Sequence, residues 1–194
     1  MRRSVARVPQ GEQDRASIEC ARRAVQVQPG QIIVHPFHGV MRVQGITTRR
    51  LKRGEVDYVE LTDLGGALAV SIPVETTDTV GLRPVVTREK IHELMGVLAS
   101  PADTKREQWS RRIKAHQERL HSGDIEQLCV VIRDILGTGD VVRGSAEGQM
   151  LQYAMGHVSA EFADALGVSG EEAEIFIERA VRGADAPADL VPAA

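Results

Sequence analysis

The sequence predicts an α+β protein in which a small antiparallel β-barrel precedes an all-α module of about five helices. Two observations support this fold class. Short Val- and Ile-rich runs separated by turn residues fill positions 27–86, and apolar residues at helical spacing fill positions 87–182. The change of pattern near residue 87 places a boundary between two modules that are joined without a flexible linker.

The composition of the 194-residue chain is that of an ordinary folded protein, with 42% apolar and 26% charged residues. Aromatic residues make up only 3%, so we expect a core of Val, Ile, Leu and Ala. No apolar run has membrane-spanning length, and the Met-Arg-Arg start is not followed by the apolar run of a secretory signal. Cys20 and Cys129 show no paired spacing. We therefore expect a reduced, cytoplasmic protein.

The first module begins at Pro29-Gly30 and is expected to contain four or five short strands. The clearest runs of strand length cover residues 31–35, 40–46, 56–61 and 68–72. Residues 51–54 predict a hairpin loop, and Gly65-Gly66 predict the next turn. Short strands at this spacing favour a Tudor- or SH3-like barrel.

The second module is predicted to be helical because its apolar residues recur every three or four positions. Each of the five expected helices has a capping residue at its start: Thr87, Asp103 or Thr104, Asp124, Ser145 and Ser169. Breaks are expected at Ser100-Pro101, Ser122-Gly123, Gly137 and Gly167, and the last helix ends near Val181. Ser169 and Glu172 have the spacing of a capping box.

The two ends of the chain differ in charge, although the net charge of the whole chain is only −3. Residues 1–26 hold six arginines and no sustained apolar period, so we expect a disordered basic extension. This extension is either a solvated tail or an arm that touches nucleic acid. Residues 147–194 hold nine acids against two arginines, and residues 183–194 are expected to form a flexible tail.

No catalytic or cofactor-binding motif is present. The sequence lacks GxxxxGK[ST], GxGxxG, HExxH and GxSxG, so we expect neither an enzyme nor a bound cofactor. His35 and His38 could supply two metal ligands, but no third ligand lies near them in sequence. The alternative is a turn in which both imidazoles bond to backbone groups, and we expect no metal site.

The most informative segment is residues 105–114, which surrounds the only tryptophan, Trp109. It contains one acid and five basic residues, namely Lys105, Arg106, Arg111, Arg112 and Lys114. Basic side chains spread around a helix suit contacts with phosphates, and an apolar ring can wedge into the DNA minor groove. The alternative interpretation is a core tryptophan that anchors the helix, with solvated charges around it.

Several separated segments follow one another in a familiar order. They are Val27-Gln28-Pro29-Gly30, Val34-His35-Pro36-Phe37-His38-Gly39, Thr48-Arg49-Arg50 with Tyr58, Val70-Ser71-Ile72-Pro73-Val74-Glu75, Val80-Gly81-Leu82-Arg83, Trp109-Ser110-Arg111-Arg112-Ile113-Lys114 and Ser122-Gly123-Asp124. In these segments the chain resembles the CarD/CdnL family of bacterial transcription regulators. The resemblance covers about residues 27–136 with few or no gaps and extends more loosely to about residue 182.

This resemblance implies both a fold and a mechanism. In the family, a Tudor-like domain (here 27–86) resembles that of transcription-repair coupling factors and binds the β1 lobe of the RNA polymerase β subunit. A helical domain (here 87–182) contacts promoter DNA at the upstream edge of the transcription bubble, where a tryptophan wedges into the minor groove and stabilises the open complex. The implied partners are RNA polymerase and promoter DNA, at the nucleoid and without a membrane. A monomer is the simplest expectation.

Carried over residue by residue, the resemblance assigns Trp109 as the wedge. Candidate phosphate contacts are Arg106, Arg111, Arg112 and Lys114, and candidate polymerase contacts are Arg49, Arg50 and Ser71. Ser71 stands where the family usually presents a second arginine, and serine cannot replace a bidentate cation. A second interpretation therefore stays open. The chain could be a divergent paralogue that acts as a protein-interaction adaptor, with altered or lost polymerase and DNA binding.

Overall fold

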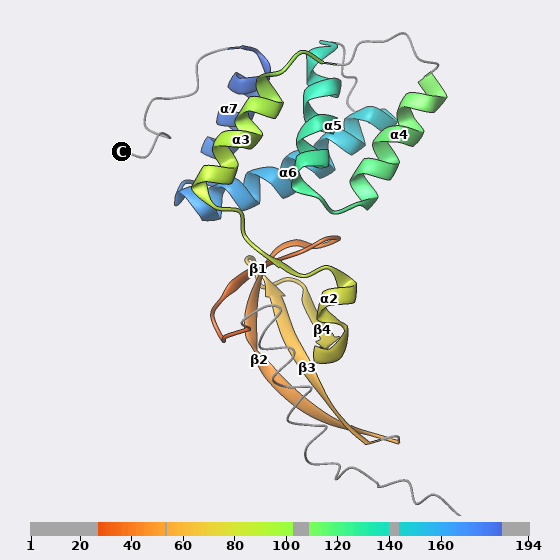
Figure 1. The fold of residues 1–194 in the computed structure, drawn as a ribbon, viewed down its shortest axis with the longest axis vertical. Coiled ribbons are helices and arrows are strands. Elements are labelled where there is room, and N and C mark those ends of the chain that lie inside the picture. The colour runs from red at the N-terminus through yellow and green to blue at the C-terminus, as the bar shows by residue number, and fades with distance from the viewer. Residues whose placement is uncertain (1–26, 53, 103–108, 140–143, 184–194) are drawn as a thin grey trace, which may run out of the picture. The chain divides into compact units, whose positions relative to one another are not determined.

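The computed structural model describes residues 27–52, 54–102, 109–139 and 144–183 (Figure 1). These residues form two compact units. One unit contains the described residues up to 33 together with 41–84, and the other contains 34–40 together with the described residues from 85 onward. The expected N-terminal extension, and all of the expected C-terminal tail except Gly183, lie outside the described residues.

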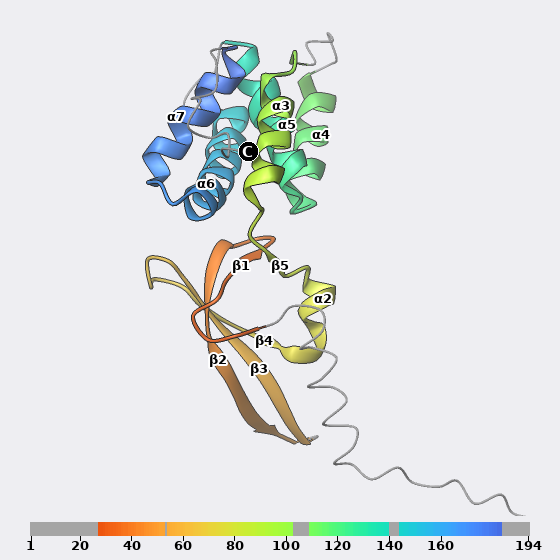
Figure 2. The same ribbon diagram turned by 60° about the vertical axis from the view of Figure 1, so that its left-hand side comes forward.

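The first unit is built on a five-stranded sheet with the strand order β4-β3-β2-β1-β5 (Figure 2). The strands are β1 (Ile32–His35), β2 (Gly39–Leu51), β3 (Gly54–Asp63), β4 (Ala69–Pro73) and β5 (Arg83–Pro84). The pairs β2–β3 and β3–β4 are antiparallel. Together with the helices that follow, this sheet confirms the expected α+β fold class.

The β2–β3 hairpin determines which side chains share a face of the sheet. Its register pairs Leu51 with Gly54, directly at the predicted loop. A bulge between Val43 and Gly45 shifts the register once. Side chains alternate between faces along a strand, so the register separates a buried apolar face from a polar one. The buried apolar residues of this core are Ile33, Met41, Val43, Val59, Leu61, Ile72, Val74 and Leu82.

A short helical segment after β4 was not predicted from the sequence. A 3₁₀ turn (Val74–Thr76) leads into α2 (Thr77–Val80), which ends at Gly81 with a φ of +85°. Thr77 is buried, and its hydroxyl donates to the carbonyl of Val74 at 2.9 Å. One helical turn is too short to show an apolar period, so the sequence pattern carried no signal for it.

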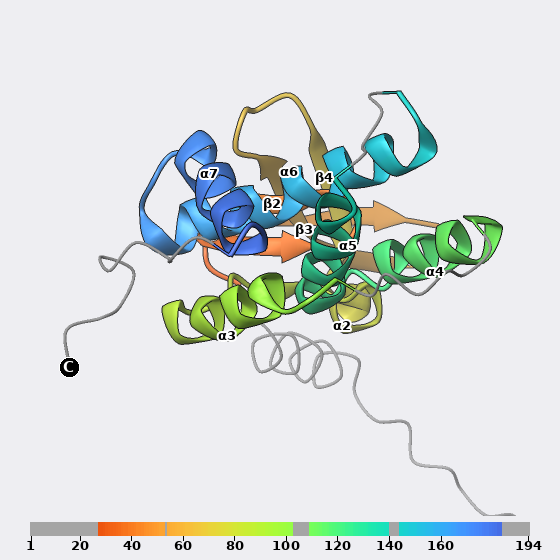
Figure 3. The ribbon, with the colours of Figure 1, turned by 90° about the horizontal axis from the view of Figure 1, so that it is seen from above.

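The second unit contains the five helices that the sequence predicts. They are α3 (Arg88–Ala99), α4 (Trp109–His121), α5 (Ile125–Gly137), α6 (Ala146–Leu166) and α7 (Gly170–Val181). Helix α5 lies between α3 and α4 (Figures 1 and 3). The core includes Ile132, Phe162 and Ile177, none of which has measurable exposure. Helix α4 packs on α5 and α6 at one side of this core.

The predicted capping residues fix where the helices begin. The side chains of Thr87, Asp124 and Ser145 each accept a hydrogen bond from a backbone N–H in the first turn. Ser169 and Glu172 form the predicted capping box. Each such cap stabilises its helix by about 1 kcal/mol. The predicted cap of α4, at 103 or 104, lies outside the described residues.

None of the helices in the described part of the chain is both long enough and apolar enough to cross a membrane.

Candidate functional site

Trp109 is exposed at the beginning of α4. Its relative exposure is 60%, the largest among the exposed large apolar residues of the described chain. The preceding residues, which include Lys105 and Arg106, lie outside the described residues. A core tryptophan would be almost fully covered, so the structure does not support the interpretation of Trp109 as a core anchor.

The position of Trp109 along the helix explains this exposure. Trp109, Ile113 and His116 share one side of α4 because they are spaced four and three residues apart. Ile113 packs partly against the helical core, and His116 is only 2% exposed. The same side of the helix is therefore buried one turn further along and open at its first residue. The helix backbone, anchored by the core, presents the indole ring to solvent.

Two of the four predicted phosphate-contacting residues are also exposed. Arg111 lies on the outer side of α4. The side chain of Lys114 is 79% exposed, and its ammonium lies 3.9 Å from a carboxylate oxygen of Glu118, four residues later. An exposed pair at this distance adds little stability and is easily exchanged for another anion. Arg111 and Lys114 are thus accessible, on a different side of α4 from Trp109.

Arg112 has a different environment. Its Nε donates to Oε1 of Glu147 at 2.8 Å, and its Nη2 lies 2.8 Å from the same oxygen. Glu147 belongs to the first turn of α6, where the helix dipole favours an acid. Arg112 therefore braces α4 against α6, and its charge is already paired. The sequence could not show this pairing, because the two residues are 35 positions apart.

A buried acid on α5, Asp134, forms an ion pair with the C-terminal half of α4. Asp134 is 6% exposed and lies 3.5 Å from Nη1 of Arg119. The guanidinium of Arg133 donates to the same carboxylate at 2.7 and 2.8 Å. Through Arg119, this cluster links the C-terminal half of α4 to α5.

His116 is buried beneath α4 without a hydrogen-bond partner on either ring nitrogen among the described residues. Burial lowers the pKa of its imidazole, while the nearby carboxylate of Asp134 partly opposes this effect. A neutral, unpaired histidine in this position is costly for folding. It supplies no accessible acid or base.

The predicted polymerase-contacting residues Arg49 and Ser71 lie together on the polar face of the sheet. Nη2 of Arg49 donates to Oγ of Ser71 at 2.9 Å and to Oε1 of Glu60 at 2.7 Å. The hydroxyl of Ser71 donates to Oε2 of Glu60 at 2.5 Å. The guanidinium of Arg49 also lies over the ring of Tyr58, 4.9 Å from its centre. Sequence reasoning did not identify Glu60 as part of this surface.

Arg50 does not join this cluster. In the antiparallel register Arg49 is opposite Val56, whereas Arg50 is opposite Glu55. Adjacent residues of a strand point to opposite faces, so Arg50 faces away from Arg49 and Ser71. The structure therefore brings together two of the three predicted polymerase contacts.

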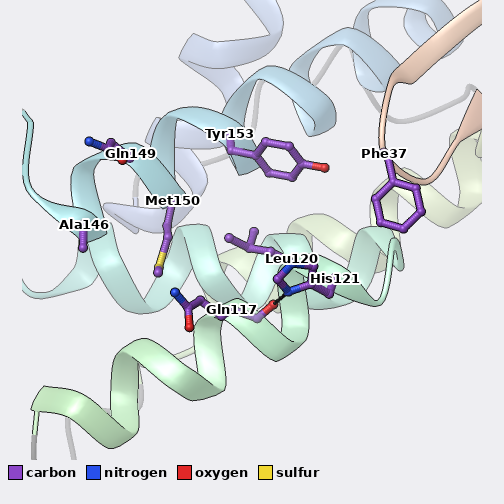
Figure 4. Close-up of a pocket in the computed structure, with 8 residues that line it drawn as sticks. All are labelled: Phe37, Gln117, Leu120, His121, Ala146, Gln149, Met150 and Tyr153. Carbon is purple, nitrogen blue, oxygen red and sulfur yellow. Dashed lines mark hydrogen bonds between the residues drawn. The ribbon is translucent and has the colours of Figure 1, made fainter.

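A groove with a volume of about 480 Å³ lies between α4 and α6 (Figure 4). Its lining residues are Phe37, Gln117, Leu120, His121, Ala146, Gln149, Met150 and Tyr153. They include no Lys, Arg, Asp or Glu, so the groove does not suit a phosphate. Phe37 belongs to the 34–40 segment that packs with the helical unit.

His35 and His38 form a turn. The N–H of Phe37 donates to Nδ1 of His35 at 3.1 Å, and the two imidazole rings lie 4.5 Å apart. Burial and the neighbouring His38 lower the pKa of His35 to about 4. No group of three His, Cys, Asp or Glu side chains in the described residues is arranged to hold a metal ion. His35 makes a backbone hydrogen bond of the kind that the turn interpretation expects of both imidazoles, whereas the His38 imidazole makes none among the described residues.

Comparison with known proteins agrees with this arrangement of two modules. A family model described as "CarD-like/TRCF RID domain" matches residues 27–86, and one described as "CarD, C-terminal domain" matches residues 93–178. The chain belongs to the CarD family. A protein of Bacillus subtilis (strain 168), named "Putative transcription factor YdeB", is similar to it. The two are 21% identical over 150 residues, which cover 77% of this chain and 98% of the relative.

Family membership gives the function at a coarse level. CarD-like/TRCF RID domains interact with RNA polymerase, and CarD-family proteins are non-enzymatic transcription factors. This CarD-family chain is therefore a transcription regulator that interacts with RNA polymerase. Its two candidate contact surfaces are the exposed N-terminal part of α4, which carries Trp109, Arg111 and Lys114, and the face of the sheet that carries Arg49 and Ser71.

Proposed function

We propose that this CarD-family protein stabilises the promoter open complex. In this proposal the sheet binds the β1 lobe of the RNA polymerase β subunit through the face that carries Arg49. The helical unit then meets promoter DNA at the upstream edge of the bubble, where Trp109 enters the minor groove. The protein acts as a monomer in the cytoplasm, at the nucleoid.

The exposure of Trp109 carries this proposal. The indole of Trp109 is 60% exposed, so its ring contributes much less to folding than a buried tryptophan does. Apolar side chains placed in this way are used to open a base step and to hold bent or melted DNA. Arg111 and Lys114 lie within two turns of the ring and are accessible to the phosphates on either side.

The measurement that tests the proposal is the lifetime of the open complex formed by the host RNA polymerase on one promoter. Wild type should lengthen the lifetime, and Trp109→Ala should remove most of that gain. Ile175→Ala is a matched control, because Ile175 is an exposed apolar residue of α7 (44%) away from the basic helix. A Trp109→Ala variant that lengthens the lifetime as well as wild type does would exclude the wedge.

A second candidate function is supported by the pairing of two predicted contact residues. Arg49 is paired with Glu60, and Arg112 is paired with Glu147. If both ion pairs stay closed in the presence of polymerase and DNA, neither arginine is available for its predicted contact. The chain then acts as an adaptor whose sheet binds a different protein and whose helices do not bind DNA. Such an adaptor would leave the open-complex lifetime unchanged and would not co-purify with polymerase.

A further inference from the structure

Glu60 lies on the polar face of β3, opposite Ser71 of β4, and accepts a hydrogen bond from Arg49. One carboxylate oxygen accepts from Nη2 of Arg49 at 2.7 Å, and the other accepts from the Ser71 hydroxyl at 2.5 Å. Nη2 of Arg49 also donates to Ser71 at 2.9 Å. The three side chains form a closed ring of hydrogen bonds, which we call the Glu60 ring, across β2, β3 and β4.

The Glu60 ring uses both hydrogens of Nη2. A guanidinium can bind a carboxylate with two hydrogen bonds in two ways. The end-on arrangement uses Nη1 and Nη2, and the side-on arrangement uses Nε and Nη2. Because Nη2 takes part in both arrangements, neither is free while the ring is intact. Nη1 and Nε of Arg49 have no hydrogen-bond partner among the described residues, so they can still make single contacts.

Glu60 also neutralises the charge of Arg49. The pair is only partly exposed, at 50% for the arginine side chain and 24% for the glutamate side chain. Screening by water is weaker for such a pair than for two fully exposed groups. Ser71 adds no positive charge to replace it. The polar face therefore presents a neutral pair where a single cation would attract an acidic partner.

We propose that Glu60 is a specificity-determining residue of the polymerase-binding face. Glu60 competes with acidic groups of the partner for Arg49, and the hydroxyl of Ser71 holds Glu60 in place. This inference rests on the proposed function, in which Arg49 meets an acidic patch of RNA polymerase. To form a two-bond contact with that patch, the Glu60 ring must open. Opening the ring costs free energy. This chain therefore binds polymerase more weakly than it would if Arg49 were free.

The test is the affinity of the full chain for the host RNA polymerase, measured for wild type and for Glu60→Gln. Glutamine keeps the shape of the side chain and removes its charge. We expect Glu60→Gln to bind about tenfold more tightly at low salt, and we expect the gain to shrink as salt rises. Glu55→Gln is the matched control, because it makes the same charge change in the same strand on the face of Arg50. Its affinity should stay within about twofold of wild type.

Further variants show whether Glu60 acts through Arg49. In an Arg49→Gln background, Glu60→Gln should give no gain, because the group it competes for is gone. Ser71→Ala should give a smaller gain than Glu60→Gln, because it frees one hydrogen of Nη2 and leaves the ion pair. A merely structural role of Glu60 would change the thermal unfolding temperature without producing this dependence on Arg49.

Two sets of results separate the possible failures. A Glu60→Gln variant that binds polymerase as wild type does, or more weakly, overturns the competition while the polymerase contact stands. The weaker result would show that Glu60 itself meets a basic group of the partner. If wild type does not bind polymerase, or if Arg49→Gln binds as tightly as wild type, the proposed contact through Arg49 is wrong, and this inference falls with it.

Discussion

Arg112 and Glu147 join helix α4 to helix α6, with Nε and Nη2 of the arginine both 2.8 Å from one carboxylate oxygen. Both side chains are about one quarter to one third exposed. Arg112 is at the same time a candidate phosphate contact. The residue therefore has a measurable structural role that its neighbour Arg111 lacks, and the two roles can be separated by experiment.

The brace predicts that Arg112→Gln lowers the stability of the protein. The expected loss in free energy of unfolding is about 0.5–1 kcal/mol, small because water partly screens the pair. Urea unfolding of the full chain measures it. Arg111→Gln is the control, because Arg111 makes no ion pair with another described residue, and it should change stability by less than about 0.3 kcal/mol. Equal losses in the two variants would contradict the brace.

Phosphate contacts by Arg111 and Lys114 predict a salt-dependent affinity for DNA. A residue that neutralises one phosphate adds about 0.9 to the slope of log affinity against log salt concentration. Arg111→Gln and Lys114→Gln should each reduce that slope by about this amount on a forked promoter duplex. Arg179→Gln, an exposed change on α7, should leave the slope unaltered. An unaltered slope in all three variants would favour the adaptor function.

The buried His116 predicts that stability falls as the pH is lowered. Its folded-state pKa lies below its ordinary value of 6.5, so the unfolded chain binds the proton first. The contribution that neutral His116 makes to stability is therefore fully present above about pH 6.5, and it is lost as the pH falls toward the folded-state pKa. His35, whose pKa is lowered to about 4, adds a loss of the same sign over the interval from 6.5 to 4.

Replacing His116 by Leu tests this assignment. Removing two unpaired buried nitrogens should raise stability at pH 7.5 by about 1 kcal/mol, and it should reduce the loss between pH 7.5 and pH 5. His35 contributes to the loss that remains. Gln117→Leu, an exposed change on the same helix that removes no titratable group, serves as the control and should follow the wild-type pH profile. A His116→Leu variant with the wild-type pH profile would show that His116 does not titrate with folding.

The helical unit was largely predictable from the sequence, because its signals are local. Caps at Thr87, Asp124, Ser145 and Ser169 act within one turn, and the buried residues recur at the helical period. The exposure of Trp109 was not predictable in the same way. Its spacing from Ile113 and His116 fits a buried stripe, and whether neighbouring helices reach the first turn depends on how they pack.

The polar face of the sheet was predictable in part. A departure from the family pattern drew attention to Ser71, and the motif drew attention to Arg49. Glu60 gave no signal, because its importance comes from the register that places it beside Ser71, 11 residues away, and near Arg49. Arg50 is next to Arg49 in sequence but faces the other side of the sheet, because adjacent residues of a strand point to opposite faces.

Replacing Gly123 tests how tightly the 34–40 segment packs against the helices. Gly123 has a φ of +67°, and a Cβ built there would lie 2.5 Å from Cβ of Pro36. Gly123→Ala therefore adds a steric clash to backbone strain, and we expect a loss of about 2–3 kcal/mol in the free energy of unfolding. Gly167→Ala is the control, because Gly167 has a φ of +74° with open space around it. It should cost about 1 kcal/mol from strain alone. Urea unfolding of both variants gives the difference, which measures the contact with Pro36. Equal losses would mean that Pro36 moves aside freely and that the 34–40 segment is only loosely packed against the helices.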